Sequence, residues 1–225
     1  MRHLLIAATL LLPLPAAAQT PPGPSELRVY AGLHAAAAKG DAAEIARLIA
    51  AGQNPNAQDP QSRTPLIVAA HFRHAGAAEA LMKAGANANA LDAQKYDIVT
   101  IAAVNDDVPM LKAALAGGCN PKNITSPYNG TALIAAAHLG HEEVVRVLIA
   151  AGAPLDHVNN LGWTALMESI VLGNGGKRHT DTLEALVKAG ANLNIADRQG
   201  VTPLGHAKTR GYATMVRILE AAGAR

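Results

Sequence analysis

The sequence contains few aromatic residues and almost no cysteine. Six aromatic side chains make up 3% of its 225 residues, although 50% of the chain is hydrophobic. A core must therefore be assembled from alanine, leucine, valine and isoleucine, which suits close packing between short helices and predicts an all-α fold. Cys119 is the only cysteine, so an intramolecular disulfide is excluded and stability has to come from packing.

A large excess of positive charge is also missing. Lys and Arg number 19 against 17 Asp and Glu, and no basic stripe runs along the chain. Nucleic acid is therefore not expected as a partner, because phosphate binding depends on clustered Lys and Arg. Beyond the N-terminal segment no apolar run approaches the roughly 20 residues of a membrane helix, so we expect no membrane insertion after that segment is removed.

The N-terminal segment has the order of a secretory signal peptide. Arg2 precedes a short apolar run at positions 4–14, and a small-residue stretch follows that ends at Ala18. These are the three regions of an export signal. We predict a signal peptide at residues 1–18, cleaved after Ala18, and a periplasmic or secreted location. Residues 19–28, which are polar and rich in proline, are predicted to form a disordered leader.

The rest of the chain repeats itself about every 33 residues. One position recurs as glycine, with successive spacings of 33, 33, 34, 38 and 33, and another recurs as an aliphatic residue. A period of this size predicts a solenoid, in which each unit buries its face only against its neighbours. Six units fit the recurring glycines Gly52, Gly85, Gly118, Gly152, Gly190 and Gly223 and the aliphatic residues Leu33, Leu66, Val99, Leu133, Leu166 and Leu204.

Each unit reads as a short helix, a tight turn and a longer helix. The recurring glycine supplies a left-handed cap at the end of the second helix. Threonine at positions 64, 131, 164 and 202 can cap the free N–H groups at the start of the first helix, where the following proline is also favoured. Asn, Asp and Gly between units are typical of hairpin turns.

The run "RTPLIVAAHFRHAGAAEALMKAGANANALD" carries T-P-L-x-x-A-A at its helix start and A-G-A-x-x-N-A at its end, and it resembles an ankyrin repeat. The resemblance extends over residues 30 to 225. It implies an all-α solenoid of about six helix-turn-helix units with short hairpin fingers, occupying residues 29–225. The expected units are 29–57, 58–90, 91–122, 123–156, 157–194 and 195–225.

The third and fifth units depart from this pattern. The third has "YDIVTIAA" where T-P-L is expected and places Pro109 inside its second helix, which puts the regularity of that unit in doubt. The fifth resembles exported bacterial ankyrin proteins, which carry a similar Gly-rich extension in the penultimate repeat.

The extension "VLGNGGKRHTDT" adds five residues to the fifth unit. It is not a phosphate-binding loop, because such a loop needs a preceding strand, a glycine five residues before the G-K pair, and Ser or Thr after the lysine. Val171 and Arg178 occupy those two positions, and the preceding segment reads as helix. We therefore expect an inserted loop at 173–180. It is either a tolerated surface loop or a binding loop that presents Lys177 and Arg178.

Glu168 falls in the short helix of the fifth unit, at a position that is apolar in earlier units and His206 in the next. A buried carboxylate needs a partner. We predict a structural polar cluster of Glu168, Arg178 and His206 that holds the extension in place.

The aromatic residues indicate a binding surface. In this fold the finger tips and short helices line a concave face that binds protein partners, and Tyr and Trp are natural interface anchors. The alternative is that each ring only packs on its own hairpin. We predict partner binding by Phe72, Tyr96, Tyr128 and Trp163, with Arg63 and Arg198 as a polar rim and Lys177 and Arg178 as a secondary contact.

No catalytic constellation is present in the sequence, so we predict a non-catalytic, monomeric protein-binding module of the cell envelope, without a cofactor or metal. Cys119 replaces an alanine of other units and is expected to be a small buried group. The alternative function is sequestration of a small ligand or metal. It would use the 173–180 loop or two histidine pairs, His71 with His74 and His138 with His141, although a closed zinc site needs four ligands.

Overall fold

The computed structural model describes residues 19–225, and the predicted signal peptide at 1–18 lies outside the described residues. In the described part, one short helix precedes six helix pairs, and no strand is formed. The helices are α1 (Pro24–Val29), α2 (Gly32–Lys39), α3 (Ala42–Ala50), α4 (Pro65–His71), α5 (Ala75–Lys83), α6 (Ile98–Val104), α7 (Val108–Ala116), α8 (Ala132–Leu139), α9 (Glu142–Ala150), α10 (Ala165–Val171), α11 (Lys177–Lys188), α12 (Pro203–Thr209) and α13 (Ala213–Ala221).

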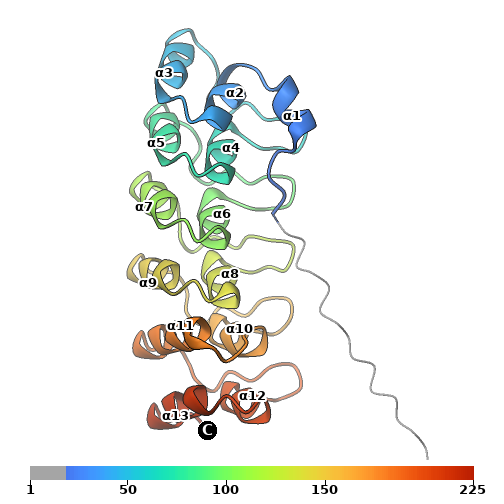
Figure 1. Ribbon diagram of the computed structural model, residues 1–225, viewed down its shortest axis with the longest axis vertical. Helices are drawn as coiled ribbons and strands as arrows, with labels where there is room; N and C mark the ends of the chain where they lie inside the picture. Colours follow the sequence, from blue (N-terminus) through green and yellow to red (C-terminus); the bar gives the residue numbers. More distant parts are fainter. Residues whose placement is uncertain (1–18) are drawn as a thin grey trace, which may run out of the picture.

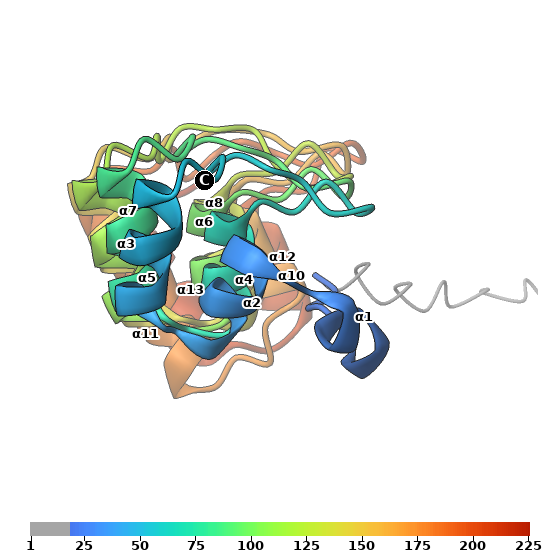
Figure 2. The ribbon, with the colours of Figure 1, turned by 90° about the horizontal axis from the view of Figure 1, so that it is seen from above.

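The six pairs stack into an elongated solenoid with two layers (Figure 1). The inner layer contains α2, α4, α6, α8, α10 and α12, and the outer layer contains α3, α5, α7, α9, α11 and α13. The loops between units extend as fingers to the inner-helix side, where α1 also lies (Figure 2). The predicted all-α solenoid of six units is confirmed.

The threonine and glycine caps predicted at the helix ends are formed in the structure. The hydroxyl oxygens of Thr64, Thr131, Thr164 and Thr202 each accept a hydrogen bond from the backbone N–H three residues later. The six recurring glycines all adopt a left-handed backbone, with φ between 81° and 90°. The departure in the third unit is local, because Pro109 lies in the first turn of α7, where no backbone donor is lost, and α7 keeps the nine residues of its neighbours.

A repeating hydrogen bond joins consecutive units at the turn between the two helices. In each case a side chain at the N-cap or in the first turn of the outer helix bonds to a backbone carbonyl of the preceding unit. The pairs are His74 with Ala38 O (3.2 Å), His141 with Ala103 O (2.8 Å), His179 with His138 O (2.9 Å) and Tyr212 with Gly173 O (2.9 Å). In the third unit the equivalent residue is Asp107, which caps α7 and cannot donate to a carbonyl.

Two predicted boundaries differ from the structure. Residues 19–28 were expected to be disordered, but Pro24–Val29 form α1, whose first turn is closed by the Glu26 carboxylate accepting from the Gly23 N–H at 2.7 Å. The inserted loop was expected to extend to residue 180, but α11 already begins at Lys177. The extension therefore consists of a short glycine-rich turn followed by an added helical turn.

Candidate functional site

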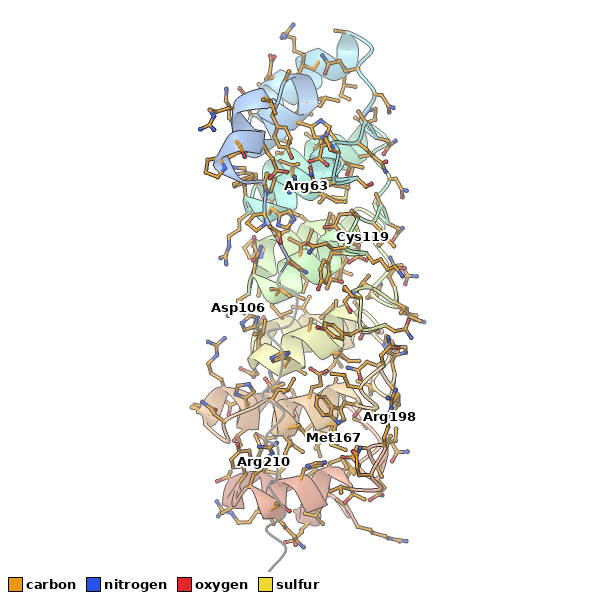
Figure 3. The ribbon with its side chains drawn as sticks, turned by 90° about the vertical axis from the view of Figure 1, so that its right-hand side faces the viewer. Arg63, Asp106, Cys119, Met167, Arg198 and Arg210 are labelled. Atoms are coloured by element: carbon orange, nitrogen blue, oxygen red, sulfur yellow. The ribbon has the colours of Figure 1, made fainter. Side chains whose placement is uncertain are left out.

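We define the finger face as the surface formed by the fingers and the ends of the inner helices. Figure 3 views the molecule from this side, with Arg63 beneath α1 and Arg198 near the other end of the stack. Each finger closes with a backbone hydrogen bond across its tip, such as Asn159 N to Trp163 O at 3.0 Å. The residue before the helix cap, which is threonine in four fingers and Asp97 in one, is Arg63, Tyr96, Gly130, Trp163 or Val201 in successive fingers.

The predicted partner-binding residues divide into two groups. Arg63 and Tyr96 are 3% and 5% exposed, so, contrary to the prediction, neither is a surface contact in this structure. Phe72, Tyr128 and Trp163 are half-buried and keep part of their surface available, and Arg198, Lys177 and Arg178 are exposed. Two further apolar side chains are exposed: Leu139 at the end of α8 (36%) and Leu161 in the finger that carries Trp163 (41%).

Arg63 is buried because it is the centre of an ion-pair network. Its Nε donates to Asp59 Oδ2 at 2.8 Å, and its Nη2 pairs with the Glu26 carboxylate of α1. Tyr30 Oη also donates to Asp59, at 2.5 Å. Burial alone would raise the pKa of Asp59, but the hydrogen bonds from Tyr30 and Arg63 outweigh it and hold that pKa below its ordinary value.

The predicted cluster of Glu168, Arg178 and His206 does not form. Glu168 is 4% exposed, and its Oε1 accepts a hydrogen bond from Asn159 Nδ2 at 2.7 Å, while Oε2 lies 3.5 Å from His138 Nδ1. His206 instead pairs with Asp197 at 2.7 Å. Burial raises the pKa of Glu168 to about 7, although the hydrogen bond from Asn159 opposes this, and burial also lowers the pKa of His138.

Arg178, the third member of that predicted cluster, lies elsewhere. Its Nε donates to Gly140 O at 3.3 Å in the fourth unit, and its Nη2 is 3.3 Å from Asp106 Oδ2 in the third. It thus connects three consecutive units at the turn edge. Lys177 pairs with Asp181 on its own helix at 2.5 Å, which leaves its side chain at the surface.

The glycines of the extension are packing positions. A side chain at Gly175, which has a φ of 69°, would meet the Tyr212 ring at 2.5 Å. Gly173 is buried, and its carbonyl accepts the hydrogen bond from Tyr212. The sixth unit therefore packs on Gly173 and Gly175, which favours a structural role for these two glycines over a ligand-binding loop.

Replacing Gly173 with alanine should lower the free energy of unfolding by about 2 kcal/mol, the cost typical of an overpacked buried site. The added Cβ would lie 2.1 Å from Ser169 O and 2.9 Å from the His179 ring, so backbone has to move. Urea denaturation followed by circular dichroism measures the loss. Gly76→Ala is the matched control, because that position is open and its stability should not fall. An unchanged Gly173 variant would contradict the packing role.

The histidine pairs are used within the solenoid. His74 and His141 bond to carbonyls of the preceding unit, and His138 faces Glu168. Within residues 19–225, no group of three or more His, Cys, Asp and Glu side chains is arranged to hold a metal ion. His71 is the exception among these histidines, because its Nε2 is buried without a hydrogen-bond partner in the described part of the chain, and burial lowers its pKa to about 4.

Cys119 is buried, and its thiol donates to Ala88 O at 3.1 Å. Burial raises the pKa of this thiol to about 12. Because the thiolate is the reactive form, Cys119 acts as a small packing residue, as the sequence predicted. Over the described residues, no helix has the length and apolar character needed to cross a membrane.

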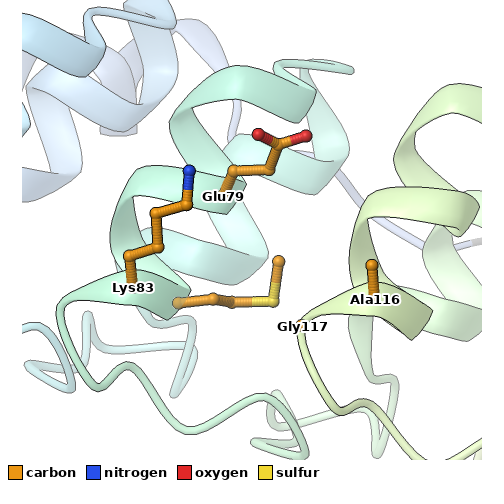
Figure 4. Close-up of a pocket in the computed structure, with 5 residues that line it drawn as sticks. Glu79, Lys83, Ala116 and Gly117 are labelled. Carbon is orange, nitrogen blue, oxygen red and sulfur yellow. The ribbon is translucent and has the colours of Figure 1, made fainter.

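A shallow hollow lies on the outer layer between α5 and α7, away from the finger face (Figure 4). It is lined by Glu79, Met82, Lys83, Ala116 and Gly117. A side chain at Gly117 would meet Met82 Sδ at 2.2 Å, so the glycine makes room for the methionine. The hollow is thus the space around one flexible side chain, and its two charged residues, Glu79 and Lys83, both come from α5 rather than converging from several elements.

A protein-family model described as ankyrin repeats (3 copies) matches residues 33–121 and 99–197. The putative ankyrin repeat protein YahD of Escherichia coli (strain K12) is 32% identical over 190 residues, which cover 84% of this chain and 94% of that protein. An ankyrin repeat domain (ABAYE2397) from Acinetobacter baumannii AYE is 44% identical with a TM-score of 0.82, covering 86% of this chain and 98% of that one. The ankyrin repeat protein EF0377 is 28% identical with a TM-score of 0.80, covering 86% and 98%.

Proposed function

We infer that this chain, which belongs to the ankyrin repeat family, is a protein-binding module that holds a partner on its finger face. Ankyrin repeat domains generally mediate protein–protein interaction, and the family is generally non-catalytic. The observation that carries the proposal is the set of partly exposed apolar side chains on the fingers, Tyr128, Leu161 and Trp163, together with Phe72 and Leu139 at the ends of α4 and α8. Aromatic anchors on a rigid scaffold bind with little ordering cost.

We place this function in the cell envelope or outside the cell. The support is the order of the first 18 residues, which has the basic start, short apolar region and small-residue site of an export signal. Arg198 supplies an exposed cation at the edge of the finger face, where polar groups typically surround an apolar interface. We propose a monomer, with a single partner bound along the stack.

A triple variant, Phe72→Ala with Tyr128→Ala and Trp163→Ala, should reduce recovery of the partner by about tenfold or more, because anchors of this type each contribute a large share of binding energy. Recovery is measured by crosslinking in cells, affinity capture of the tagged chain, and mass spectrometry. Circular dichroism checks that the variant is folded.

The matched control replaces three exposed outer-helix residues, Arg47, Lys83 and Arg146, with alanine. This variant should recover the same partner as the native chain. If both triple variants retain the partner equally, the finger face is not the binding surface. If both lose it equally, the loss has no connection with the three aromatic rings.

A further inference from the structure

The leader segment, residues 19–29, lies on the finger face outside the helical stack (Figures 1 and 2). Within this segment Pro22 is buried, and the side-chain amide of Gln19 is also buried, without a hydrogen-bond partner among the described residues. Two of its apolar side chains face solvent, Leu27 with 36% and Val29 with 78% of its surface exposed. Since little apolar surface is removed from water, packing contributes little to holding the segment in place.

Polar contacts to two fingers hold the leader segment instead. Thr20 N donates to Gln94 Oε1 at 3.2 Å, and Thr20 O accepts from Arg63 Nη1 at 3.3 Å. Six residues further along, the Glu26 carboxylate pairs with Arg63 Nη2. One backbone unit and one carboxylate are thus bound, as a protein binds an extended peptide through its main chain and one charged side chain.

The site would remain formed without the leader segment. Asp59 fixes the Arg63 guanidinium from below by accepting from Nε, and Gln61 Oε1 accepts from Nη2 at 3.1 Å. The two Nη groups would still point outward, ready for a carbonyl and a carboxylate. Because Asp59 already balances the charge of Arg63, the attraction for one further carboxylate is moderate, which suits a ligand that has to be released.

A hollow beside the leader segment shows that its own side chains do not fill the site. The hollow is lined by Thr20, Glu26, Gln61, Arg63, Asp92, Ala93 and Gln94. A different peptide with a larger side chain at this place could therefore make contacts that the leader segment does not make.

We propose that Arg63 and Gln94 form a binding site for an acidic segment of the partner protein, and that the chain's own leader segment occupies this site until the partner displaces it. This rests on the proposed function of the finger face and adds the chemistry of the ligand. Residues 19–29 act as an intramolecular competitor, so a partner has to supply an acidic group of its own to displace them.

The test uses the full chain and a fluorescent peptide with the sequence of residues 19–29, QTPPGPSELRV, as the probe. Glu26→Gln in the chain removes the internal carboxylate, and we expect the probe to bind about fivefold or more tightly to this variant than to the native chain, as for loss of a charge-assisted contact. Fluorescence anisotropy measures the affinity. Trypsin cleavage after Arg28 should accelerate by a similar factor, because the leader segment is released.

Three controls make the result specific. Glu44→Gln removes an exposed carboxylate on α3 and should leave both readouts unchanged. A probe with Gln in place of its Glu should show no gain, and adding Gln94→Ala to Glu26→Gln should abolish the gain. Equal probe binding by the native chain and the Glu26 variant, or an equal gain with the neutral probe, overturns the proposal.

These readouts need no natural partner, so they separate this proposal from the proposed function. Loss of the partner in the aromatic triple variant, together with no probe effect, would support the protein-binding function and contradict the role of the leader segment as a competitor. A probe effect, if no partner is found on the finger face, would support the peptide site and contradict the proposed protein-binding function.

Discussion

Replacing Arg63 with alanine is expected to lower the free energy of unfolding by roughly 3 kcal/mol, the low end of the cost of breaking a buried ion pair. The Arg63 and Asp59 side chains are 3% and 4% exposed and lie 2.8 Å apart. Removing the guanidinium leaves the Asp59 carboxylate away from water without its counter-charge. Denaturation in urea at pH 7, followed by circular dichroism, measures the difference.

Arg198→Ala is the matched control, because Arg198 is an exposed finger arginine whose guanidinium reaches Asn160 O. The free energy of unfolding of this variant should change by less than about 0.5 kcal/mol, as for most surface positions.

The pKa of Asp59 is depressed in the folded state, so its stabilising contribution is present above its unfolded pKa and is lost as the pH falls through the folded value. The difference between native chain and Arg63 variant should therefore shrink in acid, and equal losses for the two arginine variants at pH 7 would refute the role of Arg63.

Glu168→Gln is expected to raise the free energy of unfolding at pH 8 by about 3 kcal/mol, which is the shift in pKa from 4.5 to about 7 converted to free energy. The glutamine oxygen can still accept from Asn159, so the packing and the hydrogen bond are kept. Only the cost of a buried charge is removed. Urea denaturation at several pH values measures the effect.

The sign of the pH dependence follows from the raised pKa of Glu168. Between pH 4.5 and 7 the folded state binds the proton more strongly than the unfolded state, so this group makes the native chain more stable as the pH falls through 7. His138 acts in the opposite sense, because its lowered pKa costs stability as the pH falls below 6.5. His138→Gln removes the histidine that faces Glu168. Burial also lowers the pKa of His71, which costs stability below pH 6.5, so the Glu168 effect is clearest between pH 8 and 6.5. If the stability of the His138→Gln variant does not change between pH 8 and 6.5, the proposed cost of the buried Glu168 charge is contradicted.

The sequence predicted the fold well because the helices depend on local signals. The threonine caps at positions 64 and 131 and the left-handed Gly85 and Gly152 act within a few residues of their own helix. The regular spacing then fixes how units stack. The leader was predicted incorrectly because α1 depends on Arg63, which is 37 residues from Glu26 in sequence.

The binding surface was predicted less well because one register position has different exposures in different units. Arg63 is covered by the leader segment, Tyr96 is buried, and Trp163 is half-exposed, although all three precede a helix cap. The periodic sequence pattern predicts where each residue lies within its repeat unit, but it does not predict which other segment covers that residue.

The sequence does contain a signal for the partners of Glu168 and His206. Asn159 precedes Glu168 by nine residues, and Asp197 precedes His206 by nine residues. The register that aligns Glu168 with His206 also aligns Asn159 with Asp197. Polar pairs nine residues apart within one unit therefore predict both contacts, whereas pairs between units do not.

The histidine and tyrosine bonds between units have a consequence for cooperativity. In a solenoid each unit is coupled mainly to its nearest neighbours, so the strength of each junction decides how far an opening spreads. Asp107 cannot make the bond to the second unit, and its Oδ2 is buried without a hydrogen-bond partner among residues 19–225. The junction between the second and third units is bridged at the turn by an exposed side chain instead, because Arg73 Nη2 donates to Asn105 O. We expect this exposed bond to hold less firmly than the others, so that the junction divides the stack into one block of two units and one of four. The leader segment, which touches Gln94 of the third unit and Arg63 of the second, lies across that boundary.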